Sequence, residues 1–289
     1  MNNTTWFITG SSRGLGRAIV KAALERGDQV AATARTVSAL DDLVATYPEQ
    51  LLVLPVDVTD PRQIDEAVAR AHERFGRLDV VINNAGYANL SAIEDTTLED
   101  FRTQIDTNLF GVIATTKAVL PILRAQGGGR IINVSSVGSR IGNPGLAAYQ
   151  ASKWAVSGFT EVLAAEVAPL GILVTAIEPG GMHTDWAGSS MNIPEASAPY
   201  QQTVGFLANL FASSQTAPLG DPAKVAQAIF QLVSEKHPPV RLLLGSDALA
   251  AAQAAAAALA ASDAAWEEFS RSTDRDDATD AERDPLSIK

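Results

Sequence analysis

The sequence of 289 residues contains no cysteine, and this absence removes several kinds of chemistry at once. Without cysteine the chain forms no disulfide, has no thiolate nucleophile and offers no sulfur ligand to a metal. The three histidines, His72, His183 and His237, lie far apart and show no metal-binding spacing. We therefore expect chemistry that needs no metal ion.

Positive charge is also scarce, because 22 lysines and arginines stand against 33 aspartates and glutamates, for a formal net charge of −11. Such a surface repels the phosphate backbone, so we expect no nucleic-acid partner. It does not exclude an anionic cofactor, since a few local cations and backbone amides can hold phosphate within an acidic protein.

Leader and membrane signals are missing as well. The N-terminal residues enter an apolar strand almost at once, with no basic region before a long apolar stretch. We expect no continuous apolar segment of the ~20 residues that a membrane span needs. The Ala-rich segment 248–261 favours a helix rather than an anchor. These features predict a cytoplasmic protein that does not bind membranes.

The sequence does contain a repeated alternation of short apolar runs and amphipathic segments. Consecutive Val, Ile and Leu residues are typical of strands that are covered on both faces. The expected strands are Thr5–Thr9, Gln29–Ala34, Leu51–Val56, Val80–Asn83, Arg130–Val134, Leu173–Ile177 and Arg241–Leu243. The expected helices are Gly14–Arg26, Ser38–Thr46, Arg62–Phe75, Leu98–Arg124, Tyr149–Ala168 and Pro222–Ser234. This alternation predicts an α/β, single-domain, doubly wound Rossmann fold whose parallel sheet has helices on both faces.

Two segments interrupt the alternation. Met182–Gly220 is long and mixes Gly, Pro, Ser and Met, which is typical of a functional lid. From about Ser270 the chain is highly charged and nearly free of large apolar residues, so we expect a loosely packed tail. The predicted organisation is a catalytic domain at 1–245, with the lid at about 182–220, and an extension at 246–289 made of an Ala-rich helix and the charged tail.

A glycine-rich turn, Thr9–Gly16, joins the first expected strand to the first expected helix. Glycines at such a turn let the backbone approach a pyrophosphate, and the helix N-terminus adds free N–H groups and a positive dipole. The alternative is a tight turn that needs small residues. The position of Thr9–Gly16 directly after the first expected strand favours the phosphate-binding interpretation.

Further motifs follow in order along the chain. They are Asn83-Asn84-Ala85-Gly86 after the fourth strand, Asn108 in the next helix, Ser136 after the fifth strand, Tyr149-Gln150-Ala151-Ser152-Lys153 in the following helix, and Pro179-Gly180 with Thr184 after the sixth. Together with the glycine-rich turn they resemble the short-chain dehydrogenase/reductase family over about residues 4–245. The resemblance implies an oxidoreductase that uses a nicotinamide cofactor.

The end of the second expected strand bears on the choice between NAD and NADP. A carboxylate there accepts from the ribose 2′-hydroxyl of NAD, whereas arginine binds the 2′-phosphate of NADP. By resemblance, Ala34 occupies the carboxylate position, Arg35 follows it, and Arg13 lies in the glycine-rich turn. Two cations and no carboxylate predict NADP(H) rather than NAD(H). The alternative is that both arginines are solvated surface residues.

The resemblance assigns further cofactor contacts. Asp57 would accept from the adenine amine beside Val58, although a helix-capping or loop role is the alternative for Asp57. Thr184 would hydrogen-bond to the nicotinamide amide. The alternative is that Thr184 is an ordinary loop residue. The implied cofactor residues are Gly10, Ser12, Arg13, Gly14, Leu15, Gly16, Arg35, Asp57, Val58, Asn84, Ala85, Gly86, Tyr149, Lys153, Pro179, Gly180 and Thr184.

Tyr149 and Lys153 are four positions apart, so on a helix they share one face on consecutive turns. A phenol with an ordinary pKa near ~10 is a poor acid–base group at neutral pH, and a nearby ammonium lowers that pKa. We therefore expect Tyr149 to give a proton in reduction and to take one in oxidation. Lys153 is also expected to hold the ribose hydroxyls of the nicotinamide.

The resemblance completes the catalytic set. Ser136, rather than Ser135, would donate to the substrate oxygen and stabilise charge that develops there. Asn108 would hold a water that links the lysine to solvent. Each of these residue types alone is commonly structural. In register with the nucleotide motifs they predict hydride transfer between nicotinamide C4 and a substrate carbon, with Tyr149 moving the proton.

The expected substrate region comprises Val137–Leu146, Tyr87–Ile93 and the lid. Its apolar side chains predict an apolar or aromatic ketone or alcohol, unless they fill the lid's own core; they are Ile141, Leu146, Trp186, Met191, Phe206 and Phe211. The lid sequence is similar to the branch of hydroxysteroid dehydrogenases and carbonyl reductases, which does not identify a substrate. Because relatives are mostly dimers or tetramers, and the helix after Ser246 would cover a tetramer surface, a homodimer is expected.

Two rival functions are consistent with the same fold. A catalytically silent NADP-binding sensor typically loses the tyrosine or the lysine, and this chain keeps both. An epimerase or dehydratase of the extended relatives typically has another glycine spacing and a longer C-terminal substrate domain, which are not found here.

Overall fold

The computed structural model describes residues 3–182, 191–212 and 218–284. Its strands are β1 (Thr5–Ile8), β2 (Gln29–Ala34), β3 (Leu51–Pro55), β4 (Val80–Asn83), β5 (Gly129–Val134), β6 (Ile172–Pro179) and β7 (Arg241–Leu244). They form a 7-stranded sheet in the order β3-β2-β1-β4-β5-β6-β7, with every neighbouring pair parallel. The predicted doubly wound α/β fold with a seven-stranded sheet is confirmed.

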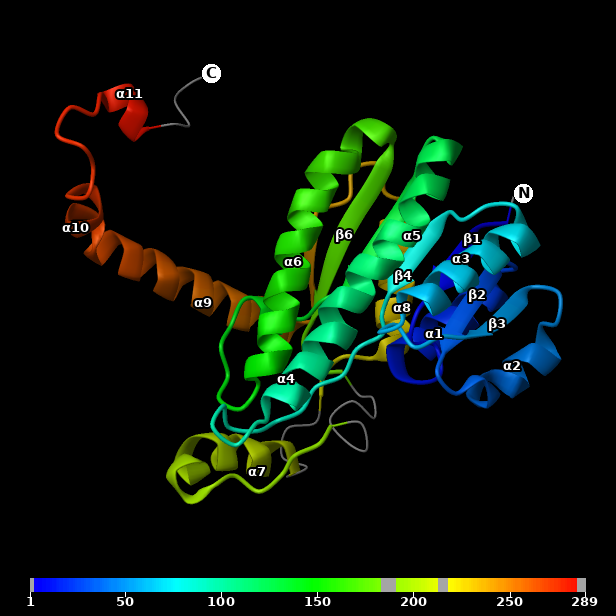
Figure 1. Ribbon diagram of the computed structural model, residues 1–289, viewed down its shortest axis with the longest axis horizontal. Helices are drawn as coiled ribbons and strands as arrows, with labels where there is room; N and C mark the ends of the chain where they lie inside the picture. Colours follow the sequence, from blue (N-terminus) through cyan, green and yellow to red (C-terminus); the bar gives the residue numbers. More distant parts are fainter. Residues whose placement is uncertain (1–2, 183–190, 213–217, 285–289) are drawn as a thin grey trace.

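Helices cover both faces of this sheet (Figure 1). Trp6 and Ile8 of β1 face a core built with α1 (Gly14–Glu25), α2 (Asp41–Thr46) and α8 (Pro222–Ser234). Phe7, between them, faces the opposite core with α3 (Pro61–Phe75), α5 (Gly111–Gln126) and α6 (Ala147–Val167). Alternate residues of a strand point to opposite faces, so a strand buried on both sides is apolar at every position.

Capping residues set where two of these helices begin. The Asp60 carboxylate accepts from the Arg62 N–H at 3.0 Å, and Pro61 occupies the first helical position of α3. The Asp221 carboxylate accepts from the Ala223 N–H at 2.8 Å ahead of Pro222 in α8. Proline suits this position because its missing N–H would have no partner there.

The single helix expected at Leu98–Arg124 is wrong in detail. The structure has α4 (Leu98–Ile105), a π-helical turn (Asp106–Phe110) and then α5. The π turn contains Asn108, whose side chain is completely buried. Such single π turns occur frequently at functional sites.

Two helical runs correct the expectation that no segment is long and apolar enough for a membrane span. Leu98–Gln126 has a mean hydropathy of 1.2 over its most apolar window, of which 39% is buried against the rest of the protein. The helix α9 (Ser246–Ala265) has a mean hydropathy of 1.3 with 11% of its window buried. Length and hydropathy alone therefore do not exclude membrane contact, although the first run includes a core helix.

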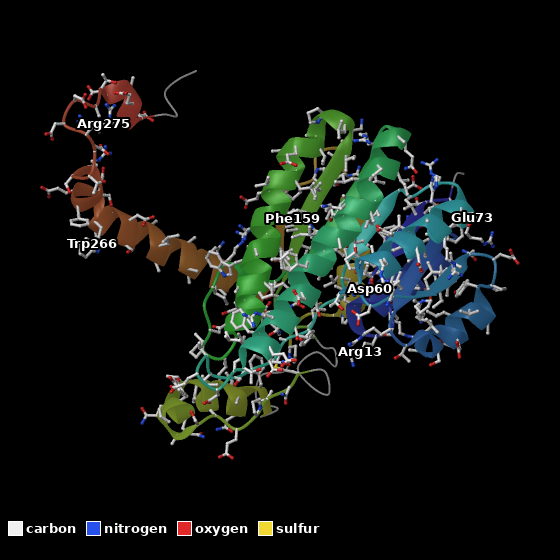
Figure 2. All side chains as sticks on the ribbon, viewed as in Figure 1. Arg13, Asp60, Glu73, Phe159, Trp266 and Arg275 are labelled. Atoms are coloured by element: carbon white, nitrogen blue, oxygen red, sulfur yellow. The ribbon has the colours of Figure 1, made fainter. Side chains whose placement is uncertain are left out.

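The helix α9 follows β7 in the chain and extends away from the body of the molecule (Figure 1). Only its first turns are packed, through the buried Ala248 and Ala252. The short helices α10 (Glu267–Arg271) and α11 (Asp280–Arg283) follow with no buried residue, and Trp266 lies far from the sheet (Figure 2).

The two ends of the lid segment are tied together. The Gly220 N–H donates to the Gly181 carbonyl at 2.8 Å, and Met182 and Gly220 form an isolated bridge. Between them, the described part of the lid contains α7 (Phe206–Ala212). The lid therefore begins and ends at one point of the fold.

Candidate active site

A cleft of about 1030 Å³ opens at the carboxyl ends of the strands. Ligands of doubly wound sheets bind at this edge, where the strand order reverses around β1 and β4. The lining residues are Gly10, Ser12, Arg13, Gly14, Leu15, Ala34, Arg35, Thr36, Ala39, Val56, Asp57, Val58, Thr59, Asn84, Ala85, Gly86, Tyr87, Asn89, Thr103, Thr107, Met182, Met191 and Asn192.

The glycine-rich turn makes close backbone contacts that no larger residue permits. Gly10 has a φ of 69°, and a Cβ there would lie 2.8 Å from the Ala85 Cα. A Cβ on Gly16 would overlap the Gly10 carbonyl oxygen and lie 2.5 Å from the Asn84 Nδ2. Asn84 joins the two segments, because its Nδ2 donates to the Thr9 and Gly10 carbonyls at 3.0 Å each. Gly16 thus supports the turn from behind and is not among the described lining residues.

Arg13 and Arg35 both line the cleft and are exposed. Arg13 lies where α1 begins, at the edge of the body (Figure 2). Ala34, the position expected to carry a carboxylate in an NAD-preferring site, is a buried alanine. An anionic group in this part of the cleft would therefore meet two guanidinium groups and the N-terminus of α1.

Asp57 combines the two roles that its sequence position left open. It lines the cleft next to Val58. Its Oδ1 also accepts from the Thr59 N–H at 3.0 Å and from the Thr59 hydroxyl at 2.8 Å. The local turn fixes the carboxylate at the cleft wall.

Ser136, Tyr149 and Lys153 come together between the end of β5 and the first turns of α6. Ser136 hydrogen-bonds to Tyr149 and accepts from the Gly138 N–H at 3.0 Å. The Lys153 Nζ lies 5.8 Å from the centre of the Tyr149 ring and donates to the Val134 carbonyl at 2.7 Å. The Ser135 hydroxyl is directed elsewhere, to the Lys153 carbonyl at 3.2 Å. Ser136 is thus the serine that contacts Tyr149.

The neighbours of these residues connect them to the cleft. A Cβ on Gly86, which lines the cleft, would lie 3.6 Å from the Lys153 Nζ. Met191, another lining residue, belongs to the same apolar cluster as Tyr149. The serine, tyrosine and lysine therefore adjoin the part of the cleft that Gly86 and Met191 line.

Burial shifts the pKa values of both Tyr149 and Lys153, and for Tyr149 the shift is opposite to the expected one. Burial raises the pKa of Tyr149 to about 12, and the hydrogen bond from Ser136 opposes this rise only in part. Burial also lowers the pKa of Lys153 to about 8. The expected lowering of the tyrosine pKa by the ammonium is therefore wrong for the protein alone, since desolvation of the phenolate is the larger effect. Tyr149 remains a protonated phenol at neutral pH.

The Asn108 amide lies between the segment after Gly86 and α6. Its Oδ1 accepts from the Tyr87 N–H at 3.0 Å, and its Nδ2 donates to the Tyr87 carbonyl at 2.9 Å and to the Ser152 hydroxyl at 3.1 Å. Gln104 donates to the same Tyr87 carbonyl at 2.8 Å. The Asn108 side chain therefore joins the segment after Gly86 to α6, and its role in holding a water stays a prediction.

Pro179 and Gly180 are not among the described lining residues of the cleft. Pro179 pairs with Leu244 of β7, and the Gly180 N–H donates to the Leu244 carbonyl at 3.0 Å. A Cβ on Gly180 would overlap the Asp247 carboxylate at the start of α9. Their structural role in this chain is to hold β6 against β7 and α9. Thr184, expected to contact the nicotinamide, lies outside the described residues.

Part of the lid forms a small apolar core over Tyr149. Leu146, Met191 and Phe211, expected to contact substrate, pack in this cluster with Tyr149, whereas Phe206 is exposed. Trp186 lies outside the described residues. Leu146 and the lid residues Met191 and Phe211 therefore pack against the tyrosine, and of these three only Met191 also lines the cleft.

Sequence reasoning missed a second wall of the cleft. Thr103 and Thr107 lie on consecutive turns beside Tyr87, and both hydroxyls donate to the carbonyl four residues earlier. The four-residue spacing of Thr103 and Thr107, next to Asn108, puts both threonines on one helix face and could have identified this wall from the sequence. Within the described ranges, no group of three or more His, Asp or Glu residues is placed to hold a metal ion.

Known proteins resemble this chain in both sequence and fold. The family model described as short chain dehydrogenase matches residues 4–193. "Oxidoreductase BOA17" of Botryotinia fuckeliana is 54% identical over 266 residues, which cover 92% of this chain and 97% of that protein. A short-chain dehydrogenase from Streptomyces avermitilis superimposes with a TM-score of 0.88 at 39% identity, covering 94% of this chain and 99% of that one.

Two further solved structures contain nicotinamide cofactors. A short-chain dehydrogenase from Burkholderia cenocepacia in complex with NADP has a TM-score of 0.72 and 26% identity, over 91% of this chain and 97% of that one. A 3-ketoacyl-(acyl-carrier-protein) reductase from Brucella melitensis complexed with NADH has a TM-score of 0.71 and 26% identity, over 85% and 98%. Similar proteins thus bind either form of the cofactor.

Proposed function

The chain belongs to the short-chain dehydrogenase family, and from this premise we propose that it interconverts a carbonyl and a secondary alcohol with NADP(H) as cofactor. The observation that carries the proposal is the Ser136–Tyr149–Lys153 group beside the cleft, in which Tyr149 and Lys153 are buried and Ser136 is half-buried. The branch of hydroxysteroid dehydrogenases and carbonyl reductases remains part of the proposal.

The residues of the cleft fit a dinucleotide. The backbone cradle at Gly10 and Gly16 leaves no room for a Cβ, which is the property a pyrophosphate-binding turn needs. Arg13 and Arg35 would hold the 2′-phosphate, and the N-terminus of α1 would hold the pyrophosphate. When bound, the nicotinamide supplies or accepts the hydride.

The protein's own groups manage the proton. Tyr149, as a phenol, donates to the substrate oxygen in reduction, and the Ser136 hydroxyl donates a hydrogen bond to the same oxygen. Lys153, on the next turn of α6, would hold the ribose hydroxyls. In oxidation Tyr149 must first lose its proton, which its pKa of about 12 opposes in the protein alone. At neutral pH the site therefore holds the protonated phenol that the reduction step requires.

The substrate class and assembly complete the proposal. Met182 and Met191 at the cleft support an apolar or aromatic ketone or alcohol. We also propose a cytoplasmic homodimer, supported by two exposed aromatic side chains, Phe110 of the π turn and Trp154 of α6. A molecular mass by light scattering equal to that of one chain would contradict the dimer.

The decisive experiment compares Tyr149→Phe with wild type on a panel of ketones, following nicotinamide absorbance with NADPH and NADH. Tyr149→Phe should reduce kcat by about 10²–10⁴-fold, because it removes the proton donor, and leave the NADPH affinity unchanged. Tyr47→Phe, a half-buried tyrosine at the end of α2, is the matched control and should keep full activity.

Three outcomes would contradict the proposal. Full activity of Tyr149→Phe would refute the role of the phenol. NADPH binding without turnover of any carbonyl or alcohol would favour the sensor. Transient cofactor reduction without net oxidation of product would favour an epimerase or dehydratase.

A further inference from the structure

The carboxylate of Glu178 is completely buried near the end of β6. A buried carboxylate is strongly destabilising unless it is paired and hydrogen-bonded. Four side chains from three segments of the chain satisfy this one. Glu178 is not among the described residues that line the cleft, so cofactor binding does not account for it.

The first contacts lead to the segment that carries Ser136. The Ser139 hydroxyl donates to the Glu178 Oε1 at 3.0 Å, and the Arg140 Nε donates to the Oε2 at 2.5 Å. Ser136 begins this short helical turn. Its position therefore follows from where the turn is held.

A second contact leads to the helix that carries Tyr149 and Lys153. The Ser157 hydroxyl donates to the Glu178 Oε1 at 3.1 Å. Ser157 also lies 2.9 Å from the Ser135 hydroxyl, which donates to the Lys153 carbonyl at 3.2 Å. One buried carboxylate thus reaches both sides of the Ser136–Tyr149 pair.

A third contact fixes the carboxylate to the edge of the sheet. The Arg241 Nε of β7 donates to the Glu178 Oε1 at 2.6 Å, and its Nη2 donates to the Ser139 hydroxyl at 3.2 Å. The Arg241 Nη1 also pairs with Glu161 of α6 at 3.0 Å, where the Glu161 side chain is 54% exposed. Glu161 therefore shares an arginine with Glu178 but has no described bond to the Ser136 turn or to Ser157.

We propose that Glu178 is a positioning residue that holds the Ser136 turn and α6 in register, so that Ser136 and Tyr149 act on one substrate oxygen. This inference rests on the proposed carbonyl chemistry. Its kinetic consequence follows from the sensitivity of catalysis to geometry, since a displacement of about 1 Å at a reacting centre reduces the rate by roughly 10²-fold.

The test compares Glu178→Gln with the matched variant Glu161→Gln. Three donors converge on Oε1 and one on Oε2, so an amide in either orientation places an NH₂ against a donor. Glu178→Gln should lower kcat per folded molecule by about tenfold or more. The KM for NADPH should change by less than about twofold, and Glu161→Gln should change both constants by less than about twofold.

A cycle with Ser136→Ala separates positioning from general destabilisation. If Glu178 acts by placing Ser136, Glu178→Gln should lower kcat by less than about threefold once Ser136 is already alanine. A full and independent loss in that background would overturn the proposal. So would wild-type kcat in Glu178→Gln alone.

Hydrogen exchange tests the positioning without using activity. Glu178→Gln should increase amide exchange in segments 136–146 and 153–158 but not in 10–25, and Glu161→Gln should change none of them. Unchanged exchange at 136–146 would overturn the proposal. If wild type reduces no carbonyl while exchange changes as expected, the proposed function fails and the positioning stands.

A milder variant covers the case in which Glu178→Gln does not fold. Ser139→Ala removes the hydrogen bond to Glu178 and the one accepted from the Arg241 Nη2, and it leaves both ion pairs of Glu178 intact. It should give the same exchange pattern and lower kcat by about threefold. Wild-type exchange and kcat in Ser139→Ala would overturn the contribution of the Ser136 turn.

Discussion

Replacement of Gly16 by alanine tests the cofactor turn most directly. The new methyl group would overlap the Gly10 carbonyl oxygen and lie 2.5 Å from the Asn84 Nδ2. Neither neighbour moves freely, because one is backbone and the other donates to the Thr9 and Gly10 carbonyls. The turn or the end of β4 must therefore shift.

The magnitude follows from three contributions. Overpacking of this kind destabilises by about 1–3 kcal/mol. Loss of one or both Asn84 hydrogen bonds adds about 1 kcal/mol each. The better helix propensity of alanine returns about 1 kcal/mol. The expected net loss of unfolding free energy is about 1–4 kcal/mol. NADPH affinity should fall by about tenfold or more, which corresponds to about 1.4 kcal/mol of lost binding.

Urea unfolding and NADPH titration measure these two effects. Gly158→Ala on α6 is the control, because an added Cβ there meets nothing within 4 Å and its φ is not in the left-handed region. The control should be more stable than wild type by up to about 1 kcal/mol and bind NADPH normally. A Gly16→Ala protein with wild-type stability and NADPH affinity would refute the close-packed turn.

Three further predictions concern charge and protonation. The Tyr149 pKa of about 12 keeps the phenol protonated, so reduction should not lose its proton donor between about pH 6 and 9. Oxidation needs the phenolate, so its rate should increase by up to about tenfold per pH unit over the same range. An oxidation rate independent of pH would contradict this. The pKa of Lys153 is lowered from the ordinary 10.5 to about 8, so between these two pH values the unfolded chain binds more protons than the folded protein, and the free energy of unfolding should rise with pH. Lys153→Met should flatten this rise. If the unfolding free energy from urea titrations depends on pH equally in Lys153→Met and wild type, the assignment is disproved. Arg35→Asp should shift preference from NADPH toward NADH in the ratio of kcat/KM, and constant selectivity would mean that Arg35 is a surface residue.

Local signals predicted much of this fold. The pairs Asp60-Pro61 and Asp221-Pro222 mark the starts of α3 and α8 because capping involves only neighbouring residues. The buried strands were visible as apolar runs for the same reason. The π turn at Asn108 was not visible, because one extra residue in a helical turn leaves the helical periodicity of the sequence almost unchanged.

The site was less predictable wherever distant segments meet. The spacing of Tyr149 and Lys153 placed them on one helix face, but the sign of the tyrosine pKa shift depends on burial under the distant Met191 and Val204. The structural role of Gly180 depends on Asp247, which follows it by a whole βαβ crossover. Motif order predicted which residues gather at the sheet edge, and packing determined their protonation and partners.

The joined ends of the lid have a consequence for how this protein can diversify. Gly181 and Gly220 meet through one backbone hydrogen bond, so the chain between them starts and returns to the same place on the sheet. A change in the length of that closed loop need not move β6 or α8. Because Met191 and Val204 of the same loop pack against Tyr149, a change in the loop that keeps the sheet in place would still alter the burial and the protonation of that phenol.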